Sequence, residues 1–95
     1  MKQPAIYMMA SGPNGTLYVG VTSNLVQRVW QHRTGAIPGF ASRYGCSRLV
    51  YFKIHSDMTA AISREKQLKG GSRARKCGLI EAGNPEWRDL YGDIL

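Results

Sequence analysis

Apolar residues along the chain form three short runs bounded by turn-forming residues. The first two runs cover residues 5–10 and 16–22, and Ser-Gly-Pro-Asn-Gly lies between them at 11–15, which is typical of a hairpin loop. The third run, LVYFKI at 49–54, is rich in residues that favour strands. These runs predict a β-hairpin and a separate third strand.

Helix boundaries are marked by capping residues between and after these strands. Ser23 or Asn24 can cap a helix that continues to about Thr34, and the Gly- and Pro-containing segment 35–47 then predicts a loop with at most a short helical turn. Asp57 can cap a helix over 58–69, which Gly-Gly at 70–71 ends. Ser72 then starts a shorter helix that reaches about residue 82.

A last helix is predicted after Asn84, with Asn84 as its cap and Pro85 at its first position. Its apolar stripe repeats at i, i+3, i+4 and i+7 and consists of Trp87, Leu90, Tyr91 and Ile94. The element order is therefore ββαβααα. We predict an α/β (α+β) fold in which helices sandwich a small three-stranded sheet, with residues 1–95 as a single domain.

The charge distribution points to a polyanionic partner. The 95 residues carry a net charge of +7, but residues 1–80 hold 12 Lys/Arg against 2 Asp/Glu, whereas residues 81–95 hold 1 against 4. A basic body of this kind favours nucleic acid as the partner. Cys46 and Cys77 have no zinc-site spacing, which predicts reduced thiols in a cytoplasmic protein. No apolar run approaches the ~20 residues of a membrane span, so export and membrane insertion are not expected.

One carboxylate lies at an unexpected position in the helix predicted over 58–69. At 100° per residue, Glu65 falls in the middle of the apolar arc and Lys69 falls beside it. A carboxylate there is costly to bury unless it is paired. Either Glu65 forms an internal i,i+4 ion pair with Lys69, or it faces a pocket as a metal ligand or an acid/base group. The apolar arc itself consists of Met58, Ala61, Ile62 and Leu68.

Three further residue types attract attention as candidate chemistry. Arg28 and His32, four residues apart, lie at the border of the apolar arc that Leu25, Val26, Val29 and Trp30 define, where they are either functional groups or ordinary border residues. Tyr7 and Tyr18 lie on the two arms of the hairpin. They share a face if paired residue numbers sum to an odd number and are separated if the sum is even, and the loop length permits both registers.

These residues together resemble the GIY-YIG nuclease superfamily, and in particular its small stand-alone bacterial members. AIY at 5–7 and YVG at 18–20 resemble the paired signature, and Arg28, His32, Glu65 and Asn84 follow in the order of the superfamily. The resemblance extends through LYVGVTSNLVQRVWQH, REKQLK and NPEWRDLY. The departures are Ala for the first Gly, Val for the Ile, and GGSRARK at 70–76 in place of a basic stretch that usually contains an aromatic residue.

The resemblance implies hydrolysis of a phosphodiester with one divalent ion, Mg²⁺ or Mn²⁺, held by Glu65. It further implies that Arg28 contacts a phosphate oxygen, that Tyr7 takes the proton of the attacking water, and that Tyr18 and His32 orient the water or relay the proton. Arg28, Lys69 and the metal would lower the pKa of Tyr7. Asn84 would brace the site, cap a helix, or do both. The resemblance also selects the odd hairpin register, which brings both tyrosines together with Arg28, His32 and Glu65.

The resemblance therefore favours a metal-dependent endonuclease acting on DNA, or on RNA. The alternatives are a nucleic-acid-binding module with the same fold and little catalysis, and a small basic protein that binds another protein or RNA. No additional DNA-reading domain fits in this length, so selectivity would come from DNA structure, from a homodimer or from a protein partner. The residues predicted to contact the nucleic acid backbone are Arg64, Lys66, Arg73, Arg75 and Lys76.

Overall fold

The sheet at the centre of the molecule has three antiparallel strands in the order β2-β1-β3. The computed structural model describes residues 3–95. Strand β1 (Ala5–Ala10) is central, β2 (Leu17–Thr22) and β3 (Arg48–Ile54) are its two neighbours, and the 11–15 segment joins β1 to β2. All six residues of β1 are buried, because helices cover both of its faces. The predicted hairpin and third strand are confirmed.

Three of the helices begin at the capping residues that the sequence indicated. Helix α1 (Leu25–Thr34) starts at Asn24, whose side chain accepts a hydrogen bond from the Gln27 amide, and ends at Gly35. Helix α3 (Met58–Gly70) starts at Asp57 in the same manner, and α4 (Arg73–Gly83) starts at Ser72. A short helix, α2 (Phe40–Arg43), is the helical turn expected within 35–47.

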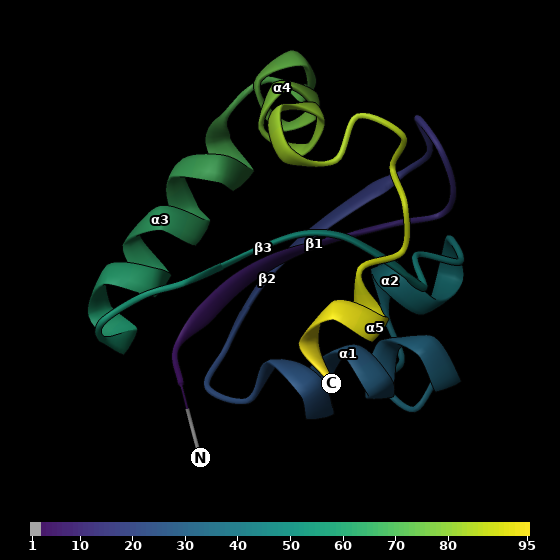
Figure 1. Ribbon diagram of the computed structural model, residues 1–95. Helices are drawn as coiled ribbons and strands as arrows, with labels where there is room; N and C mark the ends of the chain where they lie inside the picture. Colours follow the sequence, from purple (N-terminus) through teal and green to yellow (C-terminus); the bar gives the residue numbers. More distant parts are fainter. Residues whose placement is uncertain (1–2) are drawn as a thin grey trace.

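The helices divide into two layers, one on each face of the sheet (Figure 1). Because side chains alternate along a strand, Ile6 and Met8 of β1 pack against α3 and α4, while Tyr7 and Met9 pack toward α1 and α2. The result is the predicted α+β sandwich, and it has one small core on each face of the sheet. Within residues 3–95 no helix combines the length and the apolar character that crossing a bilayer requires.

The predicted helix after Asn84 is wrong for most of its length. Only Tyr91–Ile94 is helical (α5), and the preceding residues form an irregular segment. Trp87 has a positive φ of 55° and is buried with α3 and α4, whereas Leu90 packs in the other core. The apolar stripe is thus split between the two faces of the sheet. Asp89 fixes this irregular segment against β3, because its side chain accepts hydrogen bonds from the backbone amides of Leu49 and Tyr91.

Two predicted apolar arcs are also rotated relative to the structure. On α1, Val26 and Trp30 are exposed, and the buried positions are Leu25, Val29 and His32. On α3, Met58 and Ile62 are exposed as well, while Ala61 and Leu68 are buried. On α1 the rotation places His32 on the buried side with Leu25 and Val29, and it brings Arg28 near enough to act on Tyr7 of the sheet.

Candidate active site

Tyr7 lies at the centre of the candidate site, and its position depends on the hairpin register. Tyr7 pairs with Gly20 and Met9 pairs with Tyr18, so paired numbers sum to 27 and the odd register is confirmed. Tyr7 and Tyr18 therefore lie on one face, with ring centroids 6.3 Å apart. The buried ring of Tyr7 crosses the neighbouring strand directly over Gly20. This crossing carries the phenol hydroxyl toward β2, the edge strand of the sheet.

Gly20, which the sequence analysis quoted only as the last residue of the YVG motif, determines where the Tyr7 ring can lie. A Cβ atom at this position would overlap the hydroxyl and ring tip of Tyr7, so only glycine leaves room for the crossing. A glycine inside a strand is itself a signal, because it often marks a close approach by another group. The position of Tyr7, the tyrosine of the AIY motif, thus explains why the YVG motif ends in glycine.

We expect Gly20→Ala to displace the Tyr7 hydroxyl. The overpacking should cost about 1–3 kcal/mol of unfolding free energy, because the buried Tyr7 ring must shift. If Tyr7 acts in catalysis, hydrolysis should fall by at least about 100-fold, since a misplacement near 1 Å has effects of that order. Thermal unfolding and nuclease assays would measure both quantities. Gly12→Ala, in the hairpin loop where an added Cβ meets no atom within 4 Å, is the control. A fully active Gly20→Ala protein would contradict this explanation.

His32 is the direct partner of Tyr7. Its Nε2 atom lies 2.8 Å from the Tyr7 hydroxyl oxygen in a buried hydrogen bond, and its ring also packs 5.3 Å from that of Tyr18. The other ring nitrogen, Nδ1, is buried and has no hydrogen-bond partner in the part of the chain that the structure describes. Either the phenol donates to Nε2 and the imidazole proton is on Nδ1, or Nε2 donates to the phenol oxygen. Only the first arrangement leaves His32 ready to accept the phenol proton.

Burial and neighbouring charges set the protonation states of this pair. Burial and the nearby Tyr18 outweigh the hydrogen bond and charge of Arg28, and Glu65 adds to the rise, so the pKa of Tyr7 is raised to about 12. Arg28 lowers this pKa as expected, but burial and Tyr18 outweigh it, so the expected net fall does not occur in the protein alone. The pKa of His32 is lowered from its usual 6.5, mainly by burial and also by Arg28. At neutral pH both groups are therefore uncharged.

Glu65 reaches the site from the opposite layer of the molecule. Helix α3 packs on the other face of the sheet, yet Glu65 is near enough to influence Tyr7 electrostatically. Its carboxylate pairs with Lys69 at 3.2 Å, and its side chain is only 14% exposed. The Lys69 ammonium in turn lies 6.0 Å from the centroid of the Tyr18 ring. The site therefore straddles the edge strand β2, with contributions from both helical layers, and the i,i+4 ion pair considered from the sequence is present.

Comparisons with known proteins identify the family of this chain. The GIY-YIG catalytic domain family matches residues 3–77. The chain belongs to the GIY-YIG family. A UPF0213 protein from Desulfotalea psychrophila is 34% identical over 82 residues, covering 82% of this chain and 72% of that protein. Another from Syntrophus aciditrophicus is 36% identical over 75 residues, covering 75% and 82%.

A solved structure supports the fold independently. The solution NMR structure of a UPF0213 protein from Bacillus halodurans is 23% identical and covers 88% of this chain and 92% of its own. Its TM-score of 0.53 indicates a shared fold. The GIY-YIG match identifies a nuclease-type domain, so the expected superfamily is confirmed.

The donor set of this GIY-YIG site suits one kind of metal ion. Among residues 3–95, no three His, Cys, Asp or Glu side chains form a cluster that could hold a metal. That absence does not suit zinc, which needs three or four protein ligands. A lone, largely buried carboxylate such as Glu65 does suit Mg²⁺ or Mn²⁺, because Mg²⁺ is usually held by one or two carboxylates with waters and substrate phosphate. Cys46 and Cys77 are free thiols.

Asn84 lies apart from the tyrosines in this GIY-YIG domain. Its side-chain amide donates to the carbonyls of Val50 and Arg88, and its oxygen accepts from the Arg88 amide. It therefore fastens the segment after α4 to β3, the edge opposite β2. The prediction that it caps a following helix is wrong, since it instead ends α4. The hydrogen bonds of Asn84 brace the fold at this edge of the sheet, and bracing of the active site by Asn84 stays a prediction.

The predicted backbone-contacting cations differ in their surroundings. The Arg73 guanidinium donates to the carbonyls of Asn14 and Gly15, which ties α4 to the hairpin loop. Arg64 donates to Gln67 on its own helix. Lys66 and Arg75 are exposed, and Lys76 is half-buried. Arg73 therefore has a structural role that the sequence did not indicate, because its partners lie 58 and 59 residues away along the chain.

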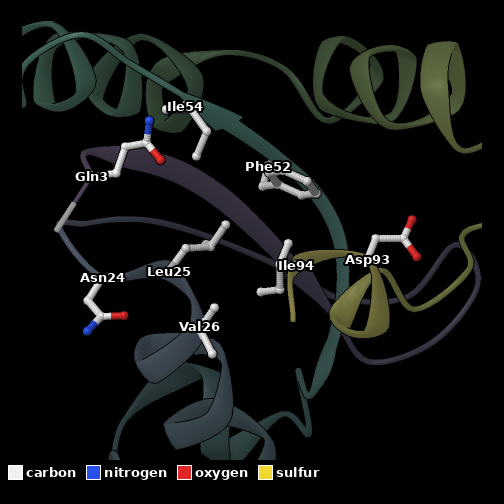
Figure 2. A pocket seen from close by; sticks show the side chains of 8 residues that line it. All are labelled: Gln3, Asn24, Leu25, Val26, Phe52, Ile54, Asp93 and Ile94. Atoms are coloured by element: carbon white, nitrogen blue, oxygen red, sulfur yellow. The ribbon is translucent and has the colours of Figure 1, made fainter. Parts of the chain in front are cut away.

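A hollow elsewhere on the molecule contains none of the predicted site residues. It has a volume of about 240 Å³ and lies where α1 and α5 approach the same region of the sheet (Figure 2). Apolar side chains form most of its wall, with Asn24 and Asp93 at its margins. The candidates around Tyr7 therefore lie at the β2 edge of the sheet, Asn84 lies at the β3 edge, and none of them lines this hollow. Its lining residues are Gln3, Asn24, Leu25, Val26, Phe52, Ile54, Asp93 and Ile94.

Proposed function

We propose that this protein is a metal-dependent endonuclease that hydrolyses phosphodiester bonds in DNA. The observation that carries the proposal is the buried hydrogen bond of 2.8 Å between Tyr7 and His32, with Arg28 and Glu65 near enough to act on Tyr7 electrostatically. A structural hydrogen bond needs neither an adjacent arginine nor a carboxylate brought from the opposite layer. These groups are instead those that a phosphodiester hydrolase uses to position phosphate, bind a divalent ion and move a proton.

Glu65 would hold the divalent ion, Mg²⁺ or Mn²⁺. When bound, that ion supplies a Lewis acid that stabilises the negative charge developing on the phosphate and the leaving oxygen. Arg28 presents a planar guanidinium to a non-bridging phosphate oxygen, a pairing that favours bidentate hydrogen bonds. Lys69 keeps the Glu65 side chain oriented through their ion pair. Tyr18, packed against both Tyr7 and His32, holds the two rings in place.

The proton of the attacking water would pass through Tyr7 to His32. With a pKa of about 12, a standing Tyr7 phenolate at pH 7 would cost about 7 kcal/mol, at 1.36 kcal/mol for each pKa unit. A relay avoids this cost. The water oxygen bonds to phosphorus as the bond to the leaving oxygen breaks, the water proton moves to the Tyr7 oxygen, and the phenol proton moves to Nε2 of neutral His32. The leaving oxygen then takes a proton from solvent.

Cleavage of defined DNA substrates tests this function. End-labelled duplex, nicked, branched and single-stranded DNA would be incubated with purified protein in Mg²⁺ or Mn²⁺, and matched reactions would contain EDTA. We expect cleavage of at least one substrate class that requires the ion and leaves internal cuts. An RNA strand of the same sequence shows whether the sugar matters. Absence of metal-dependent cleavage on every substrate, with retained binding, would instead support the binding-module alternative.

We further propose that Arg64, Lys66, Arg75 and Lys76 contact the nucleic acid backbone. Lys66 and Arg75 are the clearest candidates, because both side chains are exposed and neither forms an ion pair within residues 3–95. Arg73, engaged with the hairpin loop, could contribute only beside its structural contacts.

The double variant Lys66→Ala/Arg75→Ala should bind duplex DNA with a weaker dependence on salt. Each lost phosphate contact flattens the slope of log K against log [salt] by about 0.9, so the double variant should change it by about 1.8. Fluorescence anisotropy over a salt series measures this slope. Lys53→Ala removes an exposed charge of β3 that is not among the proposed contacts, and it should leave the slope unchanged. Equal slopes for all three proteins would place the DNA elsewhere.

A further inference from the structure

A row of aromatic side chains leads from the candidate active site to the surface. Tyr7 packs near Tyr18, whose ring stacks on Phe40 with centroids 6.3 Å apart and an interplanar angle of 26°. Phe40 in turn packs against Tyr44 at 4.6 Å. We call Tyr7, Tyr18, Phe40 and Tyr44 the aromatic row. Its first member is buried, whereas Phe40 and Tyr44 are 49% and 51% exposed.

Phe40 and Tyr44, the two exposed members of the aromatic row, are not part of either core. Phe40 begins α2 and Tyr44 directly follows it, and the small residue Ala41 is the one buried residue of this helix. The helix is fastened by Cys46, whose amide donates to the Ala41 carbonyl and whose Sγ contacts the Thr16 carbonyl. Small residues thus anchor α2, and two large aromatic rings face outward, where their exposed faces gain nothing from folding.

The charge around the row suits a polyanion. Residues 1–56 contain six Lys/Arg and no Asp/Glu. Arg43 is exposed on α2, between the two outer aromatics in sequence, and the Lys69 ammonium lies 6.0 Å from the Tyr18 ring centroid. Cations on this side would not stabilise the binding of an apolar segment from a protein partner. Aromatic rings flanked by cations are the arrangement that binds single-stranded nucleic acid, in which bases stack and phosphates pair with cations.

We propose that Phe40 and Tyr44 form a stacking platform for an unpaired nucleobase beside the phosphodiester that is cleaved. The proposal rests on the proposed function and names its substrate class: nucleic acid with a single-stranded segment, as in a single strand, a flap or a branch. In an intact duplex the base faces are covered by their neighbours, so they are not available to the platform. Continuity through Tyr18 places the stacked base next to the Tyr7–His32 pair.

Binding measurements on Phe40→Leu test the platform. Leucine keeps an apolar side chain but has no flat face to stack on. The probes are a single-stranded DNA of about 15 nucleotides, near the upper site size of such proteins, and its duplex, both in EDTA to prevent cleavage. We expect Phe40→Leu to weaken single-strand binding by about 5-fold to 100-fold and duplex binding by less than about twofold. Trp30→Leu removes an equally exposed aromatic from the outward side of α1 and should change neither.

A second measurement detects stacking itself. A 2-aminopurine base in the single strand should lose fluorescence when the parent protein binds, and Phe40→Leu should restore it at saturation. The platform is overturned if Phe40→Leu, with unchanged thermal unfolding, binds and quenches the single strand as the parent does, or if it loses duplex binding equally. If the parent protein cleaves nucleic acid in either of these cases, the stacking platform is contradicted but the proposed nuclease function is not. If the parent protein binds neither probe at low salt, both the platform and the proposed function are contradicted.

Discussion

Tyr7→Phe should reduce metal-dependent cleavage by about 10²–10⁴-fold, the range expected for loss of an acid/base group. The substitution removes one hydroxyl and leaves the ring over Gly20 in place. It also leaves Nε2 of His32 without its partner, which should cost about 1–3 kcal/mol of unfolding free energy. Single-turnover cleavage rates and thermal unfolding measure the two effects separately. Substrate binding should stay within about threefold of the parent, because the loss concerns the reaction step.

Tyr51→Phe is the matched control for this variant. Tyr51 also lies on the sheet and is half-buried, but it packs in the core on the α3 and α4 side. Among residues 3–95 its hydroxyl has no hydrogen bond comparable to that of Tyr7, so its variant should cleave at the parent rate. Tyr7→Phe cleaving within about threefold of Tyr51→Phe would remove Tyr7 from the reaction and leave it a packing residue.

The pH dependence of the cleavage rate distinguishes the relay from a Tyr7 phenolate. The lowered pKa of His32 means that its neutral form is present at pH 7 and is lost only as the pH falls below about 6.5. A relay to His32 therefore gives a rate that is flat from about pH 7 to pH 9 and declines on the acid side. A phenolate with a pKa of about 12 would instead raise the rate about tenfold for each pH unit over the same interval. That slope would contradict the relay.

Local signals account for the parts of the fold that the sequence predicted correctly. Asn24, Asp57 and Ser72 each bind an amide three residues ahead, so the start of each helix is specified within one turn of the chain. The segment after Asn84 is different, because the Asn84 amide binds the carbonyl of Val50, 34 residues earlier. Such a contact depends on the assembled sheet. Periodicity alone consequently read Trp87 and Leu90 as one helical face, although they lie in separate cores.

The candidate site shows the same division. The identities of Tyr7, His32 and Glu65 could be proposed from spacing and resemblance, and the odd register followed from the resemblance. The burial of His32 and the high pKa of Tyr7 could not be predicted, because both arise from packing between the sheet and α1. The need for Gly20 also appears only when the Tyr7 ring is seen to cross it. Sequence thus indicated which groups meet, while the assembled layers determine their protonation.

Glu65→Gln should abolish most metal-dependent cleavage while the fold is retained. The amide keeps the size of the side chain but removes the negative charge that a divalent ion requires, and metal stabilisation of the transition state is worth several kcal/mol, or about 10²–10³-fold in rate. A second variant, Glu65→Asp, keeps the negative charge on a shorter side chain. Raising the Mg²⁺ or Mn²⁺ concentration should recover part of its activity. In a plot of cleavage rate against metal concentration, Glu65→Asp should therefore have a higher half-saturation concentration than the parent protein.

Lys69→Met separates the two interpretations of Glu65, because it breaks the same ion pair from the other side. If Glu65 serves only that pair, Glu65→Gln and Lys69→Met should lower unfolding stability equally, by about 0.2–1 kcal/mol for a partly exposed pair, and neither should change the metal requirement. If Glu65 holds the ion, only Glu65→Gln loses the response to metal, whereas Lys69→Met retains it. Full metal-dependent cleavage by Glu65→Gln would assign the carboxylate to the ion pair alone.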